Sequence, residues 1–275
     1  MNKDDKILQF LYTNKLGLFL LKSIVIKPWF SKFLCRKYYT KASVRKIPEF
    51  ARKHDINIAD MTLDLKVHPN GEFSSFNDFF SRRELRDIQV ENGVFPAISD
   101  SHLSLFTIRN NMELTIKGSK YRLEELVGDR VDKSYEEGLC LVFRLSINDY
   151  HRYIFFDNGS LNNRKSIQGE LHTVRDIAQK EKVFAKNKRV VNYLDTDNFS
   201  QAIQIEIGAL LVGDIINHNI NEFRQMQEKG YFSYCGSTIV VLLQKDKLNL
   251  DSKYKEILDS DREIYVRMGE RIGRC

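Results

Sequence analysis

The sequence contains few cysteines and prolines and lacks a long uncharged hydrophobic run. The four cysteines, at positions 35, 140, 235 and 275, do not have the spacing of a zinc site or of a disulfide framework. This indicates a reduced protein that faces the cytosol. No glycine-rich loop for binding a nucleotide occurs. These absences argue against a zinc domain, a secreted disulfide-rich domain and a nucleotide-binding enzyme, and we expect no metal ion.

The apolar N-terminal stretch is interrupted by charge. Residues 7–34 are rich in Leu, Ile, Phe and Val but include Lys15, Lys22, Lys27 and Lys32. We expect no cleavable signal peptide, because a small-residue cleavage site is missing. We also expect no spanning helix, because a lysine near the centre of a bilayer costs about 2.5–3.5 kcal/mol.

The positive charge is concentrated at the same end. Residues 1–54 hold 13 Lys and Arg against 3 Asp and Glu, which leaves 30 and 34 in the remainder. Residues 1–54 therefore carry a net charge of +10 and the remainder a net charge of −4. This asymmetry indicates that the N-terminal region binds an anionic surface. Since basic and apolar residues coincide there, we favour a membrane over nucleic acid, with an interfacial helix or hairpin broken at Pro28 and Trp29 at headgroup depth. The alternative is a helix packed on the protein's own core.

The body of the sequence has the pattern of short strands. From Val94 onward, apolar or alternating segments are separated by Gly, Asn and Asp, and no proline follows Pro96. We therefore predict an α+β fold, with a helical, basic, membrane-associating region at 1–90 and a β-rich domain at 91–275. The predicted strands are 103–108, 139–145, 153–156, 189–193, 202–207 and 239–243; the predicted helical segments are 40–65, 123–126 and 219–227.

One stretch of the β-rich domain suggests chemistry. In GYFSYCGSTIVVLL, residues 230–243, a small polar link joins an aromatic segment to a strand buried on both faces. A turn that happens to contain serine is one interpretation. The other is a self-processing bond, in which the Ser237 hydroxyl attacks the Gly236 carbonyl and converts the amide into an ester. Elimination then splits the chain and leaves residue 237 as an N-terminal pyruvoyl group, and glycine suits the site because it has no side chain to block attack.

The sequence resembles the phosphatidylserine decarboxylase family, whose cleavage site is a Gly-Ser pair before an apolar strand. Other blocks support this in the same order along the chain. They are residues 76–82 (F-x-x-F-F-x-R), 98–101 (P-x-D-G), 116–126 (K-G-x-x-Y-x-L-E-x-L), 149–152 (D-Y-H-R), 169–174 with Asn187 and Arg189 (G-x-L-x-x-V and N-x-R), 207–213 (V-G-A-x-x-V-G) and 268–273 (G-E-x-I-G).

This resemblance implies a pyruvoyl-dependent carboxy-lyase that is made as a zymogen. Cleavage would yield a β chain of 1–236 and an α chain of 237–275 that remain partners, and a homodimer is compatible with it. The pyruvoyl carbonyl would form a Schiff base with phosphatidylserine and withdraw electrons as CO₂ leaves, giving phosphatidylethanolamine. The expected location is peripheral, at the cytoplasmic face of an anionic phospholipid membrane. A pyruvoyl decarboxylase of a soluble amino acid is one alternative.

The resemblance also implies the residues that activate the serine. An alcohol needs a positioned base to lose its proton, and in the family an aspartate, here Asp100, orients the histidine that does this. His151 lies in D-Y-H-R, but the family commonly continues H-R-x-H and this chain has Ile154 at that second place. Either His151 alone is the base, or His172 takes over. A non-processing relative that only binds lipid is the second alternative.

Overall fold

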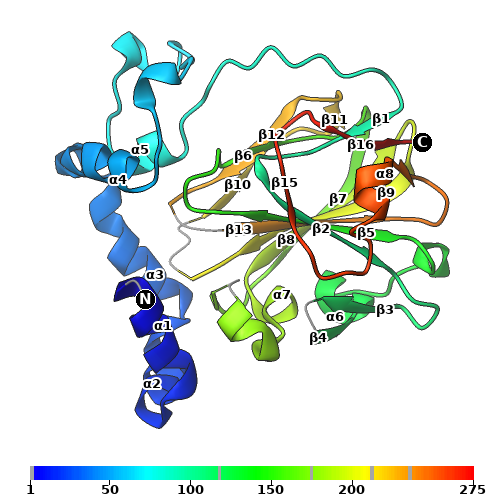
Figure 1. Ribbon diagram of the computed structural model, residues 1–275, viewed down its shortest axis with the longest axis horizontal. Helices are drawn as coiled ribbons and strands as arrows, with labels where there is room; N and C mark the ends of the chain where they lie inside the picture. Colours follow the sequence, from blue (N-terminus) through cyan, green and yellow to red (C-terminus); the bar gives the residue numbers. More distant parts are fainter. Residues whose placement is uncertain (1–2, 117–118, 174–175, 211–213, 235–236) are drawn as a thin grey trace.

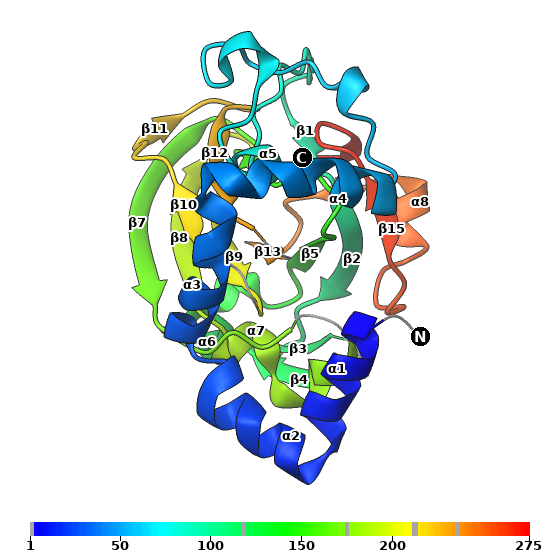
Figure 2. The same ribbon diagram turned by 90° about the vertical axis from the view of Figure 1, so that its left-hand side faces the viewer.

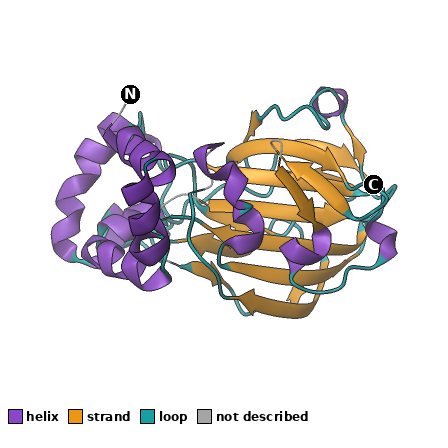
Figure 3. Ribbon diagram, turned by 90° about the horizontal axis from the view of Figure 1, so that it is seen from below, coloured by secondary structure: helices purple, strands orange, loops and turns teal. Residues whose placement is uncertain are grey.

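The N-terminal helices lie beside one end of a β-rich body. The computed structural model describes residues 3–116, 119–173, 176–210, 214–234 and 237–275. Figures 1 and 3 show the N-terminal helices grouped at one side and the strands, with a few short helices, at the other. An extended segment crosses between them in Figure 1. The predicted α+β fold is therefore confirmed. Residues 85–93, in the predicted boundary, contain neither helix nor strand.

The described helices and strands are as follows. The α-helices are α1 (Lys3–Thr13), α2 (Lys15–Leu20), α3 (Pro28–Cys35), α4 (Ile47–Lys53), α5 (Phe76–Phe80), α6 (Leu123–Val127), α7 (Val183–Lys186) and α8 (Ser252–Lys255), with a π-helix at Leu21–Val25. Short 3₁₀ helices lie at Arg36–Tyr39, Lys41–Lys46, Ile58–Asp60, Pro69–Gly71, Lys133–Tyr135 and Asp176–Glu181. The strands are β1 (Val94–Pro96), β2 (Ser101–Thr107), β3 (Glu113–Ile116), β4 (Ser119–Arg122), β5 (Leu139–Leu145), β6 (Arg152–Ile154), β7 (Gly159–Ile167), β8 (Arg189–Thr196), β9 (Ser200–Gly208), β10 (Ile215–Asn217), β11 (Glu222–Phe223), β12 (Glu228–Phe232), β13 (Ser237–Leu243), β14 (Asn249–Leu250), β15 (Ile264–Val266) and β16 (Arg271–Arg274).

The N-terminal segment is a chain of short helices because its sequence caps and breaks them. The Asn14 side chain accepts the backbone N–H groups of Leu16 and Gly17 and so starts α2. Pro28 begins α3 at a position where its missing N–H costs nothing, which confirms the predicted break. Among the residues described, no helix is both long and apolar enough to cross a bilayer.

Strand β13 lies at the centre of the largest sheet. That sheet has the order β11-β7-β8-β9-β13-β5-β2-β15, and β13 is antiparallel to both β5 and β9 over its full length. Alternate residues of β13 enter two different cores, Ile239 and Val241 on one face and Val240 and Leu242 on the other. Every β13 residue is therefore buried, which confirms the prediction of a strand covered on both faces.

The two faces of the sheet are covered by different elements. The first core is closed by the small sheets β10-β12-β6 and β1-β16-β14, whose Tyr153, Phe232 and Ile272 pack into it. The second core is closed by α6, α7 and the β3–β4 hairpin, through residues such as Leu126 and Phe184. Figure 2 looks onto the end of the sheet where α3, α4 and α5 lie in front of the strands.

Several sequence predictions need correction in detail. Residues 219–227 are not helical: β11 lies there, and buried Phe223 stacks on Phe155 with ring centroids 3.9 Å apart. Of the predicted helical stretch 40–65, only Lys41–Lys46, α4 and Ile58–Asp60 are helical. The nine-residue strand β7 was not predicted, because it has no fully buried residue and hence no alternating pattern. The six predicted strands all exist: 139–145 has the predicted ends, and the other five have shifted ends.

Arg189, in β8, connects α6 and α7 to the sheet by hydrogen bonds. Its guanidinium, buried at the start of β8, donates to the backbone carbonyls of Glu125 and Leu126 in α6 and of Ala185 and Asn187 at the end of α7. One side chain therefore satisfies four carbonyl groups near the ends of two helices, which otherwise lack intrahelical donors.

We expect Arg189→Met to lower the free energy of unfolding by at least about 2 kcal/mol, because buried carbonyls lose their donors. Urea denaturation would measure this. Arg45→Met is the matched control: Arg45 is exposed, so the same substitution there should change stability by less than about 0.5 kcal/mol. Equal effects of the two substitutions would contradict the assigned role.

Candidate active site

Ser237 is the first residue of β13 and is completely buried. It is in register with Leu145 at the end of β5 on one side and with Gly208 at the end of β9 on the other. Its Oγ has no hydrogen-bond partner among the described residues. Gly236, on the other side of the predicted scissile bond, lies outside the described residues, as does Cys235. A buried hydroxyl with no partner is costly, so this one is a candidate for chemistry.

The D-Y-H-R loop follows directly from the strand end beside Ser237. His151 is completely buried, and its Nδ1 lies 2.8 Å from the backbone carbonyl of Asp149. A carbonyl only accepts, so Nδ1 carries the hydrogen and Nε2 keeps its lone pair. In the part of the chain described, Nε2 has no partner. Burial lowers the pKa of His151 to about 3, which keeps the ring neutral.

Aromatic packing ties His151 to the chain that leads into Ser237. The ring centroid of Phe80, from α5, lies 4.0 Å from that of His151 and 5.1 Å from that of Tyr234. Tyr234 is three residues before Ser237. The carbonyl of His151 also accepts the backbone N–H of Phe232 at 3.0 Å. The imidazole and the serine are thus brought to the same end of the sheet.

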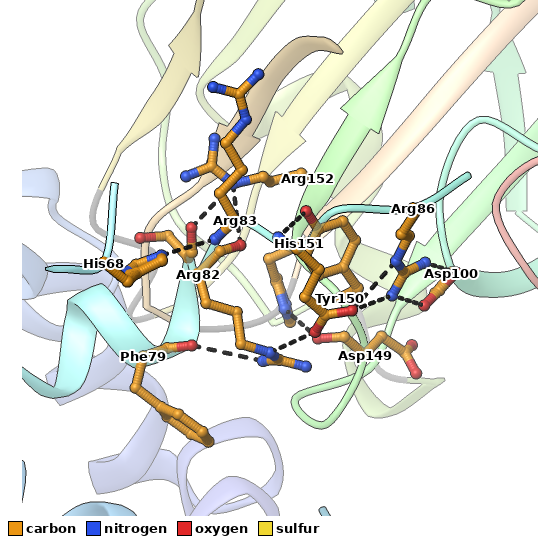
Figure 4. Close-up of polar contacts among 12 residues, drawn as sticks. His68, Phe79, Arg82, Arg83, Arg86, Asp100, Asp149, Tyr150, His151 and Arg152 are labelled. Atoms are coloured by element: carbon orange, nitrogen blue, oxygen red, sulfur yellow. Dashed lines mark hydrogen bonds and ion pairs between the residues drawn. The ribbon is translucent and has the colours of Figure 1, made fainter. Parts of the chain in front are cut away.

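The aromatic block at 76–82 and the D-Y-H-R block pack against each other. Arg152 donates from Nε to the carbonyls of Ser81 and Arg82, at 3.1 and 2.9 Å. The Tyr150 hydroxyl accepts the backbone N–H of Glu84 at 3.0 Å. Arg82 is buried and pairs with Glu84. Figure 4 shows these side chains converging around Tyr150 and His151.

Asp100 is held by an arginine. Its carboxylate accepts hydrogen bonds from both terminal nitrogens of Arg86, each at 2.9 Å, and from the backbone N–H of Met268 at 2.8 Å. Across the described residues this carboxylate meets a guanidinium and a peptide N–H and no imidazole. Asp100 directly precedes β2, and β5 lies between β2 and β13. Two strand spacings amount to roughly 10 Å, so direct contact between Asp100 and Ser237 is not expected.

His172 is linked to the β9 side of Ser237 through Asn187. Its backbone N–H donates to Asn187 Oδ1 at 2.9 Å, and Asn187 Nδ2 donates to the carbonyl of Gly208 at 2.8 Å. Gly208 is the residue in register with Ser237. Both nitrogens of the His172 ring are occupied, Nδ1 by Tyr12 Oη and Nε2 by Glu170 Oε2, each at 3.1 Å. Burial lowers the pKa of this ring as well.

Three neighbours of this site were not singled out from the sequence. Asp149 is buried, and burial raises the pKa of its carboxyl group to about 6; its place in D-Y-H-R was the only available signal. Arg86 lies over the Tyr150 ring at 3.9 Å and binds Asp100, and Tyr12 contacts His172 from the N-terminal helix. Neither Arg86 nor Tyr12 lies in a motif that would mark it.

Ile154, at the place of the second family histidine, is a core residue. It is buried in the first core, and its backbone N–H donates to the carbonyl of Ile98 at 3.1 Å. The residues around position 237 fit a pyruvoyl group. In the described part of the chain the buried Ser237 Oγ has no partner, and neither has the Nε2 of neutral His151 at the same end of the sheet.

Comparison with known proteins gives a consistent result. The family model for phosphatidylserine decarboxylase matches residues 75–274. The chain is 40% identical over 271 residues to phosphatidylserine decarboxylase proenzyme 2 of Clostridium acetobutylicum, covering 97% of this chain and 91% of the relative. It is 33% and 35% identical to the phosphatidylserine decarboxylase proenzymes of Clostridium botulinum and Clostridium perfringens, each match covering 98% of this chain and 92% of the relative. The chain therefore belongs to the phosphatidylserine decarboxylase family.

Proposed function

We propose that this chain is a carboxy-lyase that converts phosphatidylserine to phosphatidylethanolamine and CO₂ with a pyruvoyl group made from Ser237. The observation that carries the proposal is the buried Ser237 hydroxyl at the start of the central strand, which has no partner among the residues described, in a chain of this family. Cleavage between Gly236 and Ser237 gives chains of residues 1–236 and 237–275. Membership of the family, over nearly the full chain, favours this activity over a soluble amino acid substrate and over a relative that only binds lipid.

His151 is the base that we assign to Ser237. Within the described part of the chain its Nε2 lone pair has no partner, whereas both nitrogens of His172 are engaged. The His151 Nδ1–H is oriented by the Asp149 carbonyl. Burial lowers the pKa of His151, so the ring is neutral and its Nε2 lone pair is available to accept a proton. The proton taken from Oγ goes to the nitrogen of residue 237 as the peptide bond becomes an ester.

Asp100 and His172 have supporting roles in this proposal. Asp100 fixes Arg86, which lies over the ring of Tyr150, the residue next to His151. His172 holds the opposite side of the sheet end through Asn187 and Gly208. Positioning of this kind matters because small displacements of reacting groups carry large costs in rate.

After cleavage, the pyruvoyl group supplies an electron-withdrawing carbonyl that accepts electron density as CO₂ leaves, as PLP does elsewhere. The protein's own contribution is a buried site that excludes water and a histidine, His151, that can return a proton to the substrate carbon. The short C-terminal chain stays in place because β13 keeps its hydrogen bonds to β5 and β9.

The N-terminal helices are the surface that we assign to the membrane, as a peripheral contact on its cytoplasmic face. Large apolar side chains are exposed there, including Leu16, Phe19, Trp29 and Phe33, each 60% exposed or more. Lys15, Lys22 and Lys32 are exposed among them. Exposed apolar groups with interspersed lysines suit a boundary of acyl chains and anionic headgroups, where the lipid substrate lies.

The first prediction concerns the chain break. Purified wild-type protein should give two masses under denaturing conditions, for residues 1–236 and 237–275, and the two chains should elute together in native buffer. Ser237→Ala should give one mass. Thr238→Val is the matched control, since it removes the neighbouring buried hydroxyl, which also has no partner in the described chain, and it should still be cleaved. An intact wild-type chain after long incubation would refute the pyruvoyl mechanism.

The second prediction assigns the base. His151→Ala should slow cleavage by about 10²–10⁴-fold, the usual contribution of a positioned acid–base group. Asp100→Asn should stay soluble and largely uncleaved, whereas His172→Ala should be slowed less than His151→Ala. Timed mass spectrometry measures all three, with His218→Ala as the control because His218 pairs with Glu228 and lies outside the proposed machinery.

The reverse ranking, with cleavage lost in His172→Ala and normal in His151→Ala, would move the base to His172. Normal cleavage in the Asp100, His151 and His172 variants would refute this activation scheme as a whole.

The third prediction concerns lipid binding. The protein should sediment with anionic vesicles and be partly released as salt rises, since charge attraction is screened beyond about 10 Å at 0.1 M salt. Replacing Phe19 and Phe33 with Ser should weaken sedimentation at every salt concentration, because it removes exposed apolar area. Equal sedimentation with neutral and anionic vesicles would contradict the electrostatic part of the proposal.

A further inference from the structure

The N-terminal segment touches the loop that carries His172 at three points. The Tyr12 hydroxyl of α1 lies 3.1 Å from His172 Nδ1 and accepts the backbone N–H of Thr173 at 3.1 Å. The carbonyl of Ile26 accepts the backbone N–H of Leu171 at 2.8 Å. Lys27 Nζ lies 3.4 Å from Glu170 Oε1. A segment that only attached the protein to lipid would not need contacts of this kind.

The direction of these hydrogen bonds can be assigned. The Thr173 N–H can only donate, so it uses a lone pair of the Tyr12 oxygen and leaves the Tyr12 O–H free to donate to His172 Nδ1. His172 Nε2 then carries the ring hydrogen and donates to Glu170. Burial raises the pKa of Tyr12 to about 12, so the hydroxyl keeps its hydrogen at neutral pH. Tyr12 therefore fixes which tautomer of neutral His172 is present.

A second set of bonds continues from His172 to the serine. Asn187 is fully buried; it accepts the N–H of His172 and donates to the carbonyls of His172 and Gly208, at 2.9, 2.9 and 2.8 Å. Gly208 is the β9 partner of Ser237. Tyr12 is thus connected through His172 and Asn187 to Gly208, the residue of β9 that is paired with Ser237.

We propose that Tyr12 is a positioning residue for self-cleavage at Ser237, acting through the His172 loop, Asn187 and Gly208, so that the N-terminal segment completes the active site. The inference rests on the proposed function, since it assumes that Ser237 reacts. It assigns to α1 a role that needs no lipid, separate from the membrane contact of the exposed apolar residues.

The proposal has a consequence for His172 that a merely structural role would not have. The charged groups that face this ring are Glu170, Glu181 and Lys186, with Lys27 beside Glu170. The Tyr12 hydroxyl stabilises the neutral ring by donating to Nδ1. Without it, Nδ1 can take a proton while Nε2–H still faces the Glu170 carboxylate, so the pKa of His172 should rise.

The test is Tyr12→Phe, which keeps the ring and removes the hydroxyl. Tyr193→Phe is the matched control, because Tyr193, in β8, is also a partly buried tyrosine that packs against the second core. Both variants should melt close to the wild type. In lipid-free buffer, Tyr12→Phe should be cleaved about 10- to 100-fold more slowly and Tyr193→Phe at the wild-type rate. NMR titration of Ser237→Ala protein with and without Tyr12→Phe should show a higher His172 pKa in the double variant.

Wild-type cleavage rate and an unchanged His172 pKa in the Tyr12 variant would overturn the inference. Equal slowing in the Tyr193→Phe control would also overturn it, because the effect would then be general destabilisation. If the wild type itself is not cleaved, the proposed function fails, and the NMR titration still decides whether Tyr12 controls the protonation of His172.

Discussion

The hydrogen bonding of β13 between β5 and β9 is the constraint on which the rest of this structure depends. All seven residues of the strand are in register on both sides, and their side chains fill both cores. This fixes Ser237 in a buried row with Leu145 and Gly208. The same pairing lets the C-terminal piece stay in the sheet when its covalent link to the preceding chain is broken, because burial and ladder hydrogen bonds do not depend on that link.

The ends of the two flanking strands then determine what surrounds Ser237. The chain leaves β5 into the loop with Asp149, Tyr150 and His151, and β9 ends at Gly208, which Asn187 joins to the His172 loop. On the first side lies His151, whose Nε2 has no partner among residues 3–116, 119–173, 176–210, 214–234 and 237–275. On the second side lies His172, whose two ring nitrogens are both engaged. The two histidines therefore have different chemistry, which is set by their hydrogen-bond partners.

Arginines and aromatic rings from the segment between the helices and the sheet hold this arrangement together. Arg86 joins Asp100 to the Tyr150 ring, and Phe80 covers His151. A guanidinium that is partly removed from water needs carboxylate or carbonyl partners, and the half-buried Arg86 has the carboxylates of Glu84 and Asp100. The N-terminal helices contribute Tyr12, which contacts His172, and their exposed face carries apolar side chains. One segment therefore contacts the β-rich domain and also presents an apolar surface to the outside.

The sequence alone determined the α+β class, the position of the central strand and the residues that its motifs carry. A five-residue β-branched and aliphatic run identifies 239–243 as a strand buried on both faces, because no amphipathic surface strand can bear it. It did not reveal β7, whose residues lack a buried face, and it suggested a helix at 219–227, where a single buried Phe223 and strand pairing override local propensity.

The partners of the site residues were decided only by tertiary structure. Asp100 meets Arg86, His172 meets Tyr12 from 160 positions away, and Phe80 covers His151. No local pattern encodes such contacts, since they depend on how strands align and on which loops reach the same end of the sheet. The protonation state of each histidine follows from these partners and from burial, which is why the sequence could name both candidate bases and could not choose between them.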